Sequence, residues 1–293
     1  MKPTIHFLAI ALASLLSAAL AQGQNLFESD FGGGHIYEFT PNGGSSTFAS
    51  GLDFPLGLAF NSAGNLFEVD GATSHIYKFT PNGGSSTFAS GLNSPYDLAV
   101  DTAGNLFVAD QGSGDIYRFT SNGGSSTFAS GLYGPAGLAF DSAGNLFDAN
   151  YSSGNIYKFT PNGGSSTFAS GLNGPLALAF DSAGNLFEAD HNSGNIYKFT
   201  SNGGSSTFAS GLSLPLGLAF NNAGNLFEAD YGSGSIYEFT SNGGSTSFAS
   251  GGRPTYLAFP PVPEPSTCLI VGLGSIALLG VRRTKIDPRP FRN

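Results

Sequence analysis

The chain has 293 residues, a formal net charge of −9, 43 glycines, 27 phenylalanines and one cysteine. Eighteen of its 20 acidic residues but only five of its 11 basic residues lie within residues 22–260, so repulsion disfavours contact with nucleic acid or an anionic membrane surface. A single cysteine, Cys268, excludes a disulfide within the chain.

The N-terminus has the pattern of a secretory signal peptide. Lys2 precedes an apolar run from Phe7 to Leu16, and the small residues Ala19 and Ala21 precede Gln22. Signal peptides combine a positive start, an apolar stretch and a small-residue cleavage site in this order. We therefore expect residues 1–21 to be removed and the remainder of the chain to be exported.

From Asn25 onward the chain repeats itself. The tripeptide Asn-Leu-Phe starts at residues 25, 65, 105, 145, 185 and 225, a period of 40 residues. A period of this length with several short β-rich runs is typical of β-propellers, in which each repeat forms a four-stranded blade. In the repeat that begins at Leu138, apolar runs predict strands a, b, c and d at residues 138–140, 146–149, 156–159 and 167–169. Glycine, asparagine and proline between these runs favour turns.

The two ends of the repeat array predict how the ring closes. The first repeat starts at strand b with Asn25, whereas residues 256–259 provide a spare strand a at the other end. If that strand pairs beside residues 26–29, six complete blades form without a free edge. We therefore predict an all-β, six-bladed β-propeller over residues 22–260, closed by a C-terminal strand that completes the first blade. An open solenoid is the alternative, although solenoids more often have polar caps.

Residues 261–293 form a separate tail. Pro263, Glu264 and Pro265 are followed by an apolar run at residues 268–281 and then by Arg282 and Arg283. As a helix this run is about 21 Å long, shorter than the hydrocarbon core of about 30 Å. The order of these parts resembles the PEP-CTERM sorting signal of Gram-negative bacteria.

That resemblance implies processing by an exosortase-type enzyme. It also implies transient anchoring in the inner membrane through the tail alone, and a final location at the cell surface or in the extracellular matrix of a Gram-negative bacterium. The alternative is an ordinary C-terminal membrane anchor.

Strand order places the variable segments on one face of the predicted ring. The loops between strands b and c and the links between blades differ among the repeats, whereas the other turns are nearly identical. Binding surfaces are commonly built on such loops. The predicted binding residues are Phe31, Asp53, Phe54, Tyr96, Asp97, Gln111, Tyr133, Tyr151, His191 and Tyr231.

The repeat also resembles NHL and gluconolactonase-type propellers, through the pattern Pro-x-Gly-Leu-Ala-Phe-Asp-x-Ala-Gly-Asn-Leu-Phe. Enzymes of this broad group, such as gluconolactonases and virginiamycin B lyase, hold a divalent metal with polar side chains just after the link proline. The corresponding residues here are Leu56, Tyr96, Ala136, Leu176, Leu216 and Thr255. Of these and the residues that follow them, only Asp97 is a candidate ligand, and one carboxylate does not complete a coordination shell. We predict no catalytic residue, no metal site and no cofactor.

Two rings of polar residues remain. Asp30, Asp70, Asp110, Asn150, Asp190 and Asp230 end strand b, and we predict that each caps the following loop by accepting backbone N–H groups. Glu28, Glu68, Asp148, Glu188 and Glu228 lie two residues earlier. Because blades pack face to face, these carboxylates must be solvated, paired or cation-bound, and Lys78, Lys158 and Lys198 are candidate partners.

The sequence therefore predicts an exported, non-catalytic binding or matrix module at the cell surface or in exopolysaccharide. Its expected partners are the exosortase and an extracellular glycan or surface protein. A metal-dependent lactonase or lyase is the first alternative, and a structural matrix component without a discrete ligand is the second.

Overall fold

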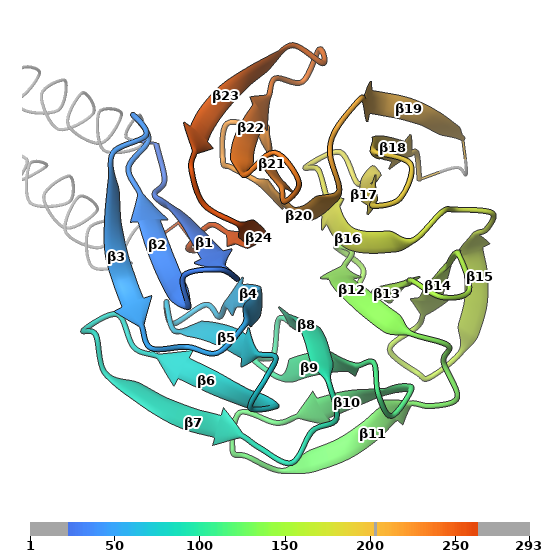
Figure 1. Ribbon diagram of the computed structural model, residues 1–293. Helices are drawn as coiled ribbons and strands as arrows, with labels where there is room; N and C mark the ends of the chain where they lie inside the picture. Colours follow the sequence, from blue (N-terminus) through green and yellow to red (C-terminus); the bar gives the residue numbers. More distant parts are fainter. Residues whose placement is uncertain (1–22, 202–203, 263–293) are drawn as a thin grey trace, which may run out of the picture. The chain divides into compact units, whose positions relative to one another are not determined.

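A computed structural model describes residues 23–201 and 204–262 of the chain. The predicted signal peptide (1–21) and the predicted tail helix (268–281) lie outside these residues. The described residues form strands β1 to β24, arranged as six four-stranded antiparallel sheets around a central axis (Figure 1). They include no helix that could cross a membrane.

Each sheet is one blade of a six-bladed propeller, with its first strand near the axis and its last strand outermost (Figure 1). Blade 1 consists of β24 (Pro254–Ala258), β1 (Leu26–Asp30), β2 (His35–Phe39) and β3 (Ser45–Ser50). Blade 2 consists of β4 (Pro55–Phe60), β5 (Leu66–Asp70), β6 (His75–Phe79) and β7 (Ser85–Ala89). Blade 3 consists of β8 (Pro95–Val100), β9 (Leu106–Asp110), β10 (Asp115–Phe119) and β11 (Ser125–Ala129).

The other three blades follow in chain order. Blade 4 consists of β12 (Pro135–Phe140), β13 (Leu146–Asn150), β14 (Asn155–Phe159) and β15 (Ser165–Ala169). Blade 5 consists of β16 (Pro175–Phe180), β17 (Leu186–Asp190), β18 (Asn195–Phe199) and β19 (Ser205–Ser210). Blade 6 consists of β20 (Pro215–Phe220), β21 (Leu226–Asp230), β22 (Ser235–Phe239) and β23 (Ser245–Ser250).

The strands are longer than the apolar runs that predicted them. In blade 4, strand a begins at Pro135 instead of Leu138, and strand d begins at Ser165 instead of Thr167. Strand a extends back because the link proline already pairs with the end of strand b, Pro135 opposite Asn150. A register shift between Pro135 and Gly137 bends the inner strand at this point.

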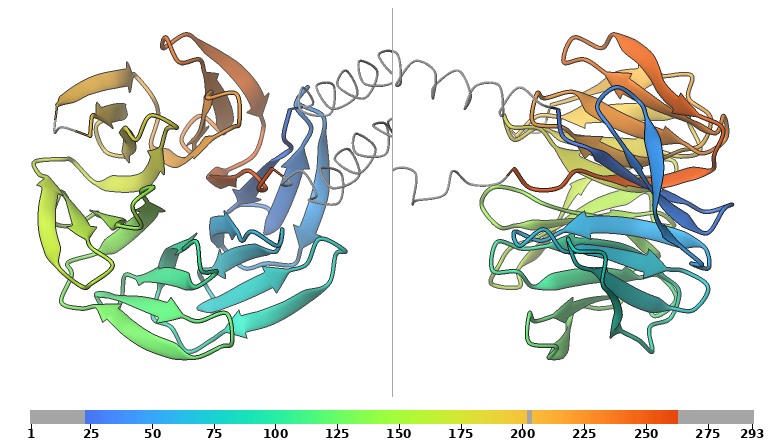
Figure 2. Two further views of the ribbon diagram at one scale, coloured as in Figure 1. Left: turned by 180° about the vertical axis from the view of Figure 1, so that it is seen from behind. Right: turned by 90° about the vertical axis from the view of Figure 1, so that its left-hand side faces the viewer.

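The last strand closes the ring as predicted. β24 pairs antiparallel with β1, with Phe27 opposite Ala258 and Glu28 opposite Leu257, and Figure 2 shows the same junction from behind. The Thr255 hydroxyl donates a hydrogen bond to the carbonyl of Ser29 at 2.8 Å. Blade 1 is therefore built from both ends of the array, and the open-solenoid alternative is wrong.

Phenylalanine side chains connect neighbouring blades. Phe147 on β13 contacts Phe168 on β15 of its own blade and Phe180 on β16 of the next, each edge-on with ring centroids 5.1 Å apart. Ile156 and Leu186 in the same cluster are fully buried. Burying a phenylalanine or leucine side chain contributes about 1.5–3 kcal/mol, so this repeated packing stabilises the ring without a disulfide.

The connections divide between two faces. The c–d turns on one face are tight hairpins. In the c–d turn of blade 4, Thr160 donates its N–H to the Gly164 carbonyl at 2.8 Å. Gly163 in this turn has a positive φ of 84°, a backbone conformation that favours glycine. On the opposite face, each link runs beside a b–c loop, as where Gly71 donates its N–H to the Phe54 carbonyl at 3.0 Å. We call this second face, made of b–c loops and links, the loop face.

Candidate functional site

Acidic side chains at the end of strand b hold the loop face in shape. Asp70 Oδ2 accepts the N–H of Asp53 in the link at 2.8 Å, and Asp70 Oδ1 accepts the N–H of Thr73 in the b–c loop at 3.1 Å. The same pair of bonds is made by Asp110, Asp190 and Asp230. These carboxylates are therefore occupied by backbone donors, and their predicted capping role is confirmed.

Three aromatic residues from different loops meet on the loop face. Phe31 in the β1–β2 loop stacks on Phe54 in the β3–β4 link, with centroids 4.5 Å apart and 13° between the rings. Tyr231 in the β21–β22 loop approaches Phe31 edge-on at 6.1 Å. Phe54 is 47% exposed and has a φ of +59°, which non-glycine residues rarely adopt. We call Phe31, Phe54 and Tyr231 the aromatic platform.

Apolar side chains pack together where the inner strands begin, near the central axis on the loop face, and we call this place the channel mouth. Ala136, Leu176 and Leu216, the residues that follow three link prolines, form a buried cluster. The side chains that pack against this cluster are those of Tyr96, Tyr151 and Tyr231. In residues 23–201 and 204–262, no three His, Cys, Asp or Glu side chains are grouped to hold a metal ion. Tyr231 belongs to both groups, so the aromatic platform adjoins the channel mouth.

Asp97 lies inside the ring, although it was predicted among the accessible binding residues. It is 6% exposed, and its Oδ2 accepts the N–H of Leu138 from the next blade at 2.9 Å. Burial raises the pKa of Asp97 to about 7, while hydrogen bonds from the Leu138 and Leu98 backbone act in the opposite direction. The residue is inside because strand a begins at Pro95, so position 97 belongs to the sheet.

Tyr96 is likewise in β8, as its second residue, whereas the other predicted binding residues lie on loops and links and differ in exposure. Tyr133 in the β11–β12 link is 72% exposed, and Asp53 is also exposed. Gln111 and His191 are half-buried in b–c loops, and the His191 ring nitrogen Nδ1 lies 3.2 Å from the Pro215 carbonyl oxygen. The sequence did not indicate which of these residues contact one another, so their role in binding stays a prediction.

A second set of acidic residues lies between the blades. Glu68, Glu188 and Glu228 are fully buried, and among the described residues both carboxyl oxygens of each have no hydrogen-bond partner. Burial, with a smaller contribution from Asp70, raises the pKa of Glu68 to about 9. A neutral carboxyl group avoids the high cost of an unpaired buried charge. Glu68 is therefore protonated at neutral pH, and burial also raises the pKa of Glu188 and Glu228 well above the usual range.

The predicted pairing of these acids with strand-c lysines is wrong. Lys158 lies 3.7 Å from Asp141, and Lys198 lies 3.8 Å from Asp181, both at a–b turns. In blade 4, Lys158 is opposite Phe147, whereas Asp148 is opposite Tyr157. Successive residues of a strand point to opposite faces of its sheet, so the lysine and the buried acid are on different sides.

The C-terminal part of the chain matches a known sorting signal. Residues 261–283 match the family model described as the PEP-CTERM protein-sorting motif. This motif implies export, processing by an exosortase and sorting to the cell surface. No curated protein sequence matches the chain.

Solved structures share the fold at low sequence identity. A chain in the crystal structure of a nidogen–laminin complex has a TM-score of 0.76 and 19% identity, covering 83% of this chain and 100% of that one. A gluconolactonase from Xanthomonas campestris has a TM-score of 0.64 and 20% identity over 70% of this chain and 79% of that one. Virginiamycin B lyase from Staphylococcus aureus has a TM-score of 0.59 and 16% identity over 77% of this chain and 83% of that one.

These neighbours include both a component of a protein complex and enzymes. Since fold alone does not determine function, they leave the activity of this chain open. The chain is a six-bladed β-propeller, similar in fold to these proteins, with a C-terminal PEP-CTERM sorting motif.

Proposed function

We propose that this protein is a non-catalytic binding module of the cell surface or exopolysaccharide matrix, and that its loop face binds a neutral glycan. The observation that carries the proposal is the aromatic platform, where stacked Phe31 and Phe54 adjoin Tyr231 and where Phe54 is 47% exposed. Large apolar side chains on an otherwise polar surface commonly mark a binding site.

The chemistry of the platform suits a saccharide. Aromatic rings offer flat apolar faces against which the C–H face of a sugar ring packs, and a tyrosine hydroxyl supplies a hydrogen bond at the edge. The excess of acidic residues in the ring disfavours polyanionic ligands. A neutral glycan of the surrounding matrix therefore fits better than an acidic one.

The non-catalytic assignment is supported by the channel mouth. Leu56, Ala136, Leu176 and Leu216 have no ligand atoms in their side chains, and Asp97 is buried with a backbone partner. A divalent ion in a lactonase-like or lyase-like site needs several oxygen or nitrogen ligands. The metal-dependent enzyme remains the alternative because two of the structural neighbours are enzymes.

A glycan array probed with the purified full chain tests the proposal, followed by titration of each glycan that binds. We expect Phe54→Ala and Phe31→Ala each to weaken binding by about tenfold, the loss typical of a central aromatic contact. Ser166→Ala on the exposed outer strand β15 is the matched control and should bind normally.

Two results would contradict the proposal. Unchanged binding by Phe54→Ala and Phe31→Ala would place the ligand elsewhere. A protein that binds no glycan on the array would instead support a structural matrix component without a discrete ligand.

A further inference from the structure

Five of the six crevices between blades are filled by a leucine from the link. Each follows the glycine that ends the sequence Phe-Ala-Ser-Gly, and each packs against the hydrophobic cluster of its crevice: Leu52, Leu92, Leu132, Leu172 and Leu212. The sixth link, between blades 6 and 1, has Gly252 at this position and is one residue shorter. This crevice therefore lacks the side chain that fills the others.

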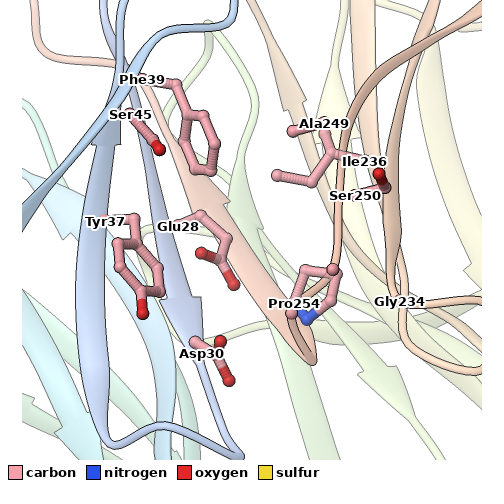
Figure 3. Close-up of a pocket in the computed structure, with 12 residues that line it drawn as sticks. Glu28, Asp30, Tyr37, Phe39, Ser45, Gly234, Ile236, Ala249, Ser250 and Pro254 are labelled. Atoms are coloured by element: carbon pink, nitrogen blue, oxygen red, sulfur yellow. The ribbon is translucent and has the colours of Figure 1, made fainter.

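A pocket of about 240 Å³ occupies the crevice where the leucine is missing. One wall comes from β1 and β2 of blade 1, and the other from β22, β23 and the following link (Figure 3). The lining of the pocket includes Glu28, Asp30, Tyr37, Phe39, Ile236 and Gly252. Pockets for drug-sized ligands begin at about 300 Å³, so a ligand of this one must be small.

Glu28 is a buried acid in this pocket, and one of its carboxyl oxygens has no partner in the residues that the structure describes. It is 2% exposed, and within the described part of the chain its Oε1 has no hydrogen-bond partner. Figure 3 shows its carboxyl group on the same side of the pocket as that of Asp30, facing Pro254 and the blade 6 wall. Burial and the nearby Asp30 carboxylate raise the pKa of Glu28 well above its usual range. The pocket thus contains a buried carboxyl group whose Oε1 has no partner among the described residues.

The remaining lining favours a cation with an apolar body. Tyr37 and Phe39 project from β2 beside the two acids, and Ile236 and Ala249 form the apolar wall opposite (Figure 3). No lysine or arginine is among the described residues that line the pocket. Ammonium groups are attracted both to carboxylates and to aromatic faces, whereas an anion would be repelled by the acids.

We propose that the pocket between blades 6 and 1 binds a small organic ammonium ion. The ammonium group pairs with Glu28 and Asp30, and the alkyl part packs against Ile236 and Ala249. This site is separate from the aromatic platform, so it does not depend on glycan binding. Pairing with a cation favours ionised Glu28, and binding is therefore accompanied by proton release from this side chain. The titratable groups beside Glu28 on blade 1 are Asp30 on β1, Tyr37 on β2 and His35, which stacks on Tyr37 with centroids 5.5 Å apart. Arg253 of the following link is the nearby basic residue, and its side chain packs against Gly32 in the β1–β2 loop.

Gly252→Leu tests the pocket with the residue that the other five links contain. Gly252 has no positive φ, so a side chain is compatible with its backbone. Its Cβ would lie 2.9 Å from Asp30 Oδ2, so the Asp30 carboxylate, whose Oδ1 accepts the N–H groups of Gly32 and Gly33, must shift slightly. We expect this variant to fold normally and to lose the site. Glu28→Gln keeps the shape of the pocket and removes the ionisable carboxyl group. The matched control is Glu228→Gln. Glu228 is an equally buried acid, and its crevice is filled by Leu212.

Isothermal titration of the full chain with n-butylammonium, and with n-butanol as its neutral counterpart, provides the measurement. We expect one site for n-butylammonium, binding of n-butanol about tenfold or more weaker, and a similar loss for Glu28→Gln. Titration in buffers of different ionisation enthalpy should show proton release for the parent but not for Glu28→Gln. Glu228→Gln should bind as the parent does.

Three results would overturn the proposal. The first is no binding of n-butylammonium by the parent at millimolar concentration. The second is equal binding by the parent and by folded Gly252→Leu, with folding checked by circular dichroism. The third is equal or tighter binding of n-butanol or of methyl glucoside, which would show a neutral-ligand pocket.

Discussion

Replacing the buried acid Glu68 by glutamine should make the stability of the propeller less dependent on pH. Glu68 is fully buried, its carboxyl oxygens lack partners, and its pKa is raised from 4.5 to about 9. Between pH 4.5 and pH 9 the folded state holds a proton on Glu68 that the unfolded chain has released. The contribution of Glu68 to the unfolding free energy is therefore fully present below pH 4.5 and decreases as the pH rises toward 9. At about 1.4 kcal/mol per pH unit, this side chain alone costs about 3 kcal/mol at pH 7.

Urea unfolding followed by circular dichroism from pH 5 to pH 9 measures the effect. The difference in unfolding free energy between the parent and Glu68→Gln should change by about 1.4 kcal/mol per pH unit in favour of the variant. The glutamine amide adds a penalty of about 1–3 kcal/mol because it also lacks partners. That penalty does not depend on pH, so the slope is the informative quantity.

Blade 3 supplies a natural control for this experiment. It has the fully buried Val108 at the position of Glu68, so an apolar side chain fits a crevice of this ring. Glu68→Val should remove the same part of the pH dependence as Glu68→Gln. Parallel stability profiles for the parent and both variants would refute a protonated Glu68 in the folded protein.

Three further predictions concern closure, processing and activity. Deletion of residues 255–259 removes most of β24 and exposes the edge of β1, so cooperative unfolding should be lost or aggregation should increase; an unchanged melting curve would argue against closure as a source of stability. Mass spectrometry of the protein from its native host should find a new C-terminus near Pro263–Pro265 and no peptide from residues 268–293, whereas an intact tail would favour a plain membrane anchor. The purified chain should retain no stoichiometric metal after dialysis and show no lactonase activity; retained metal with turnover abolished in Asp97→Ala would establish the enzyme instead.

The architecture was predictable because each repeat contains the turn residues that separate its strands. Glycines at tight turns such as Gly163 and the complementary ends of the array led to the six blades and to the closing strand. These features are local or concern strand count, and both can be read from residue spacing. Strand boundaries were less accurate, because the pairing of Pro135 with Asn150 depends on a neighbouring strand.

The environments of single side chains were harder to predict. Asp97 follows a link proline and looked accessible, but a longer strand a places it inside the ring. Lys158 and Asp148 are both in the b–c hairpin, and only the register shows that they lie on opposite sides of the sheet. The signal for the pocket was present, since Gly252 stands where five repeats have leucine. A pocket could be inferred from this difference only once the structure showed that those leucines fill the crevices between blades.

The closing strand also determines when this protein can finish folding. β1 is among the first segments to cross the membrane in a chain exported from its N-terminus, yet its inner partner β24 ends at Ala258, three residues before the sorting motif begins at residue 261. All strands of blades 2 to 5 are secreted well before β24. Blade 1, in contrast, has one unpaired edge until nearly the whole ring has been secreted. For a chain secreted in this order, completion of the fold would coincide with arrival of the sorting motif at the membrane, and translocation and ring closure would end together.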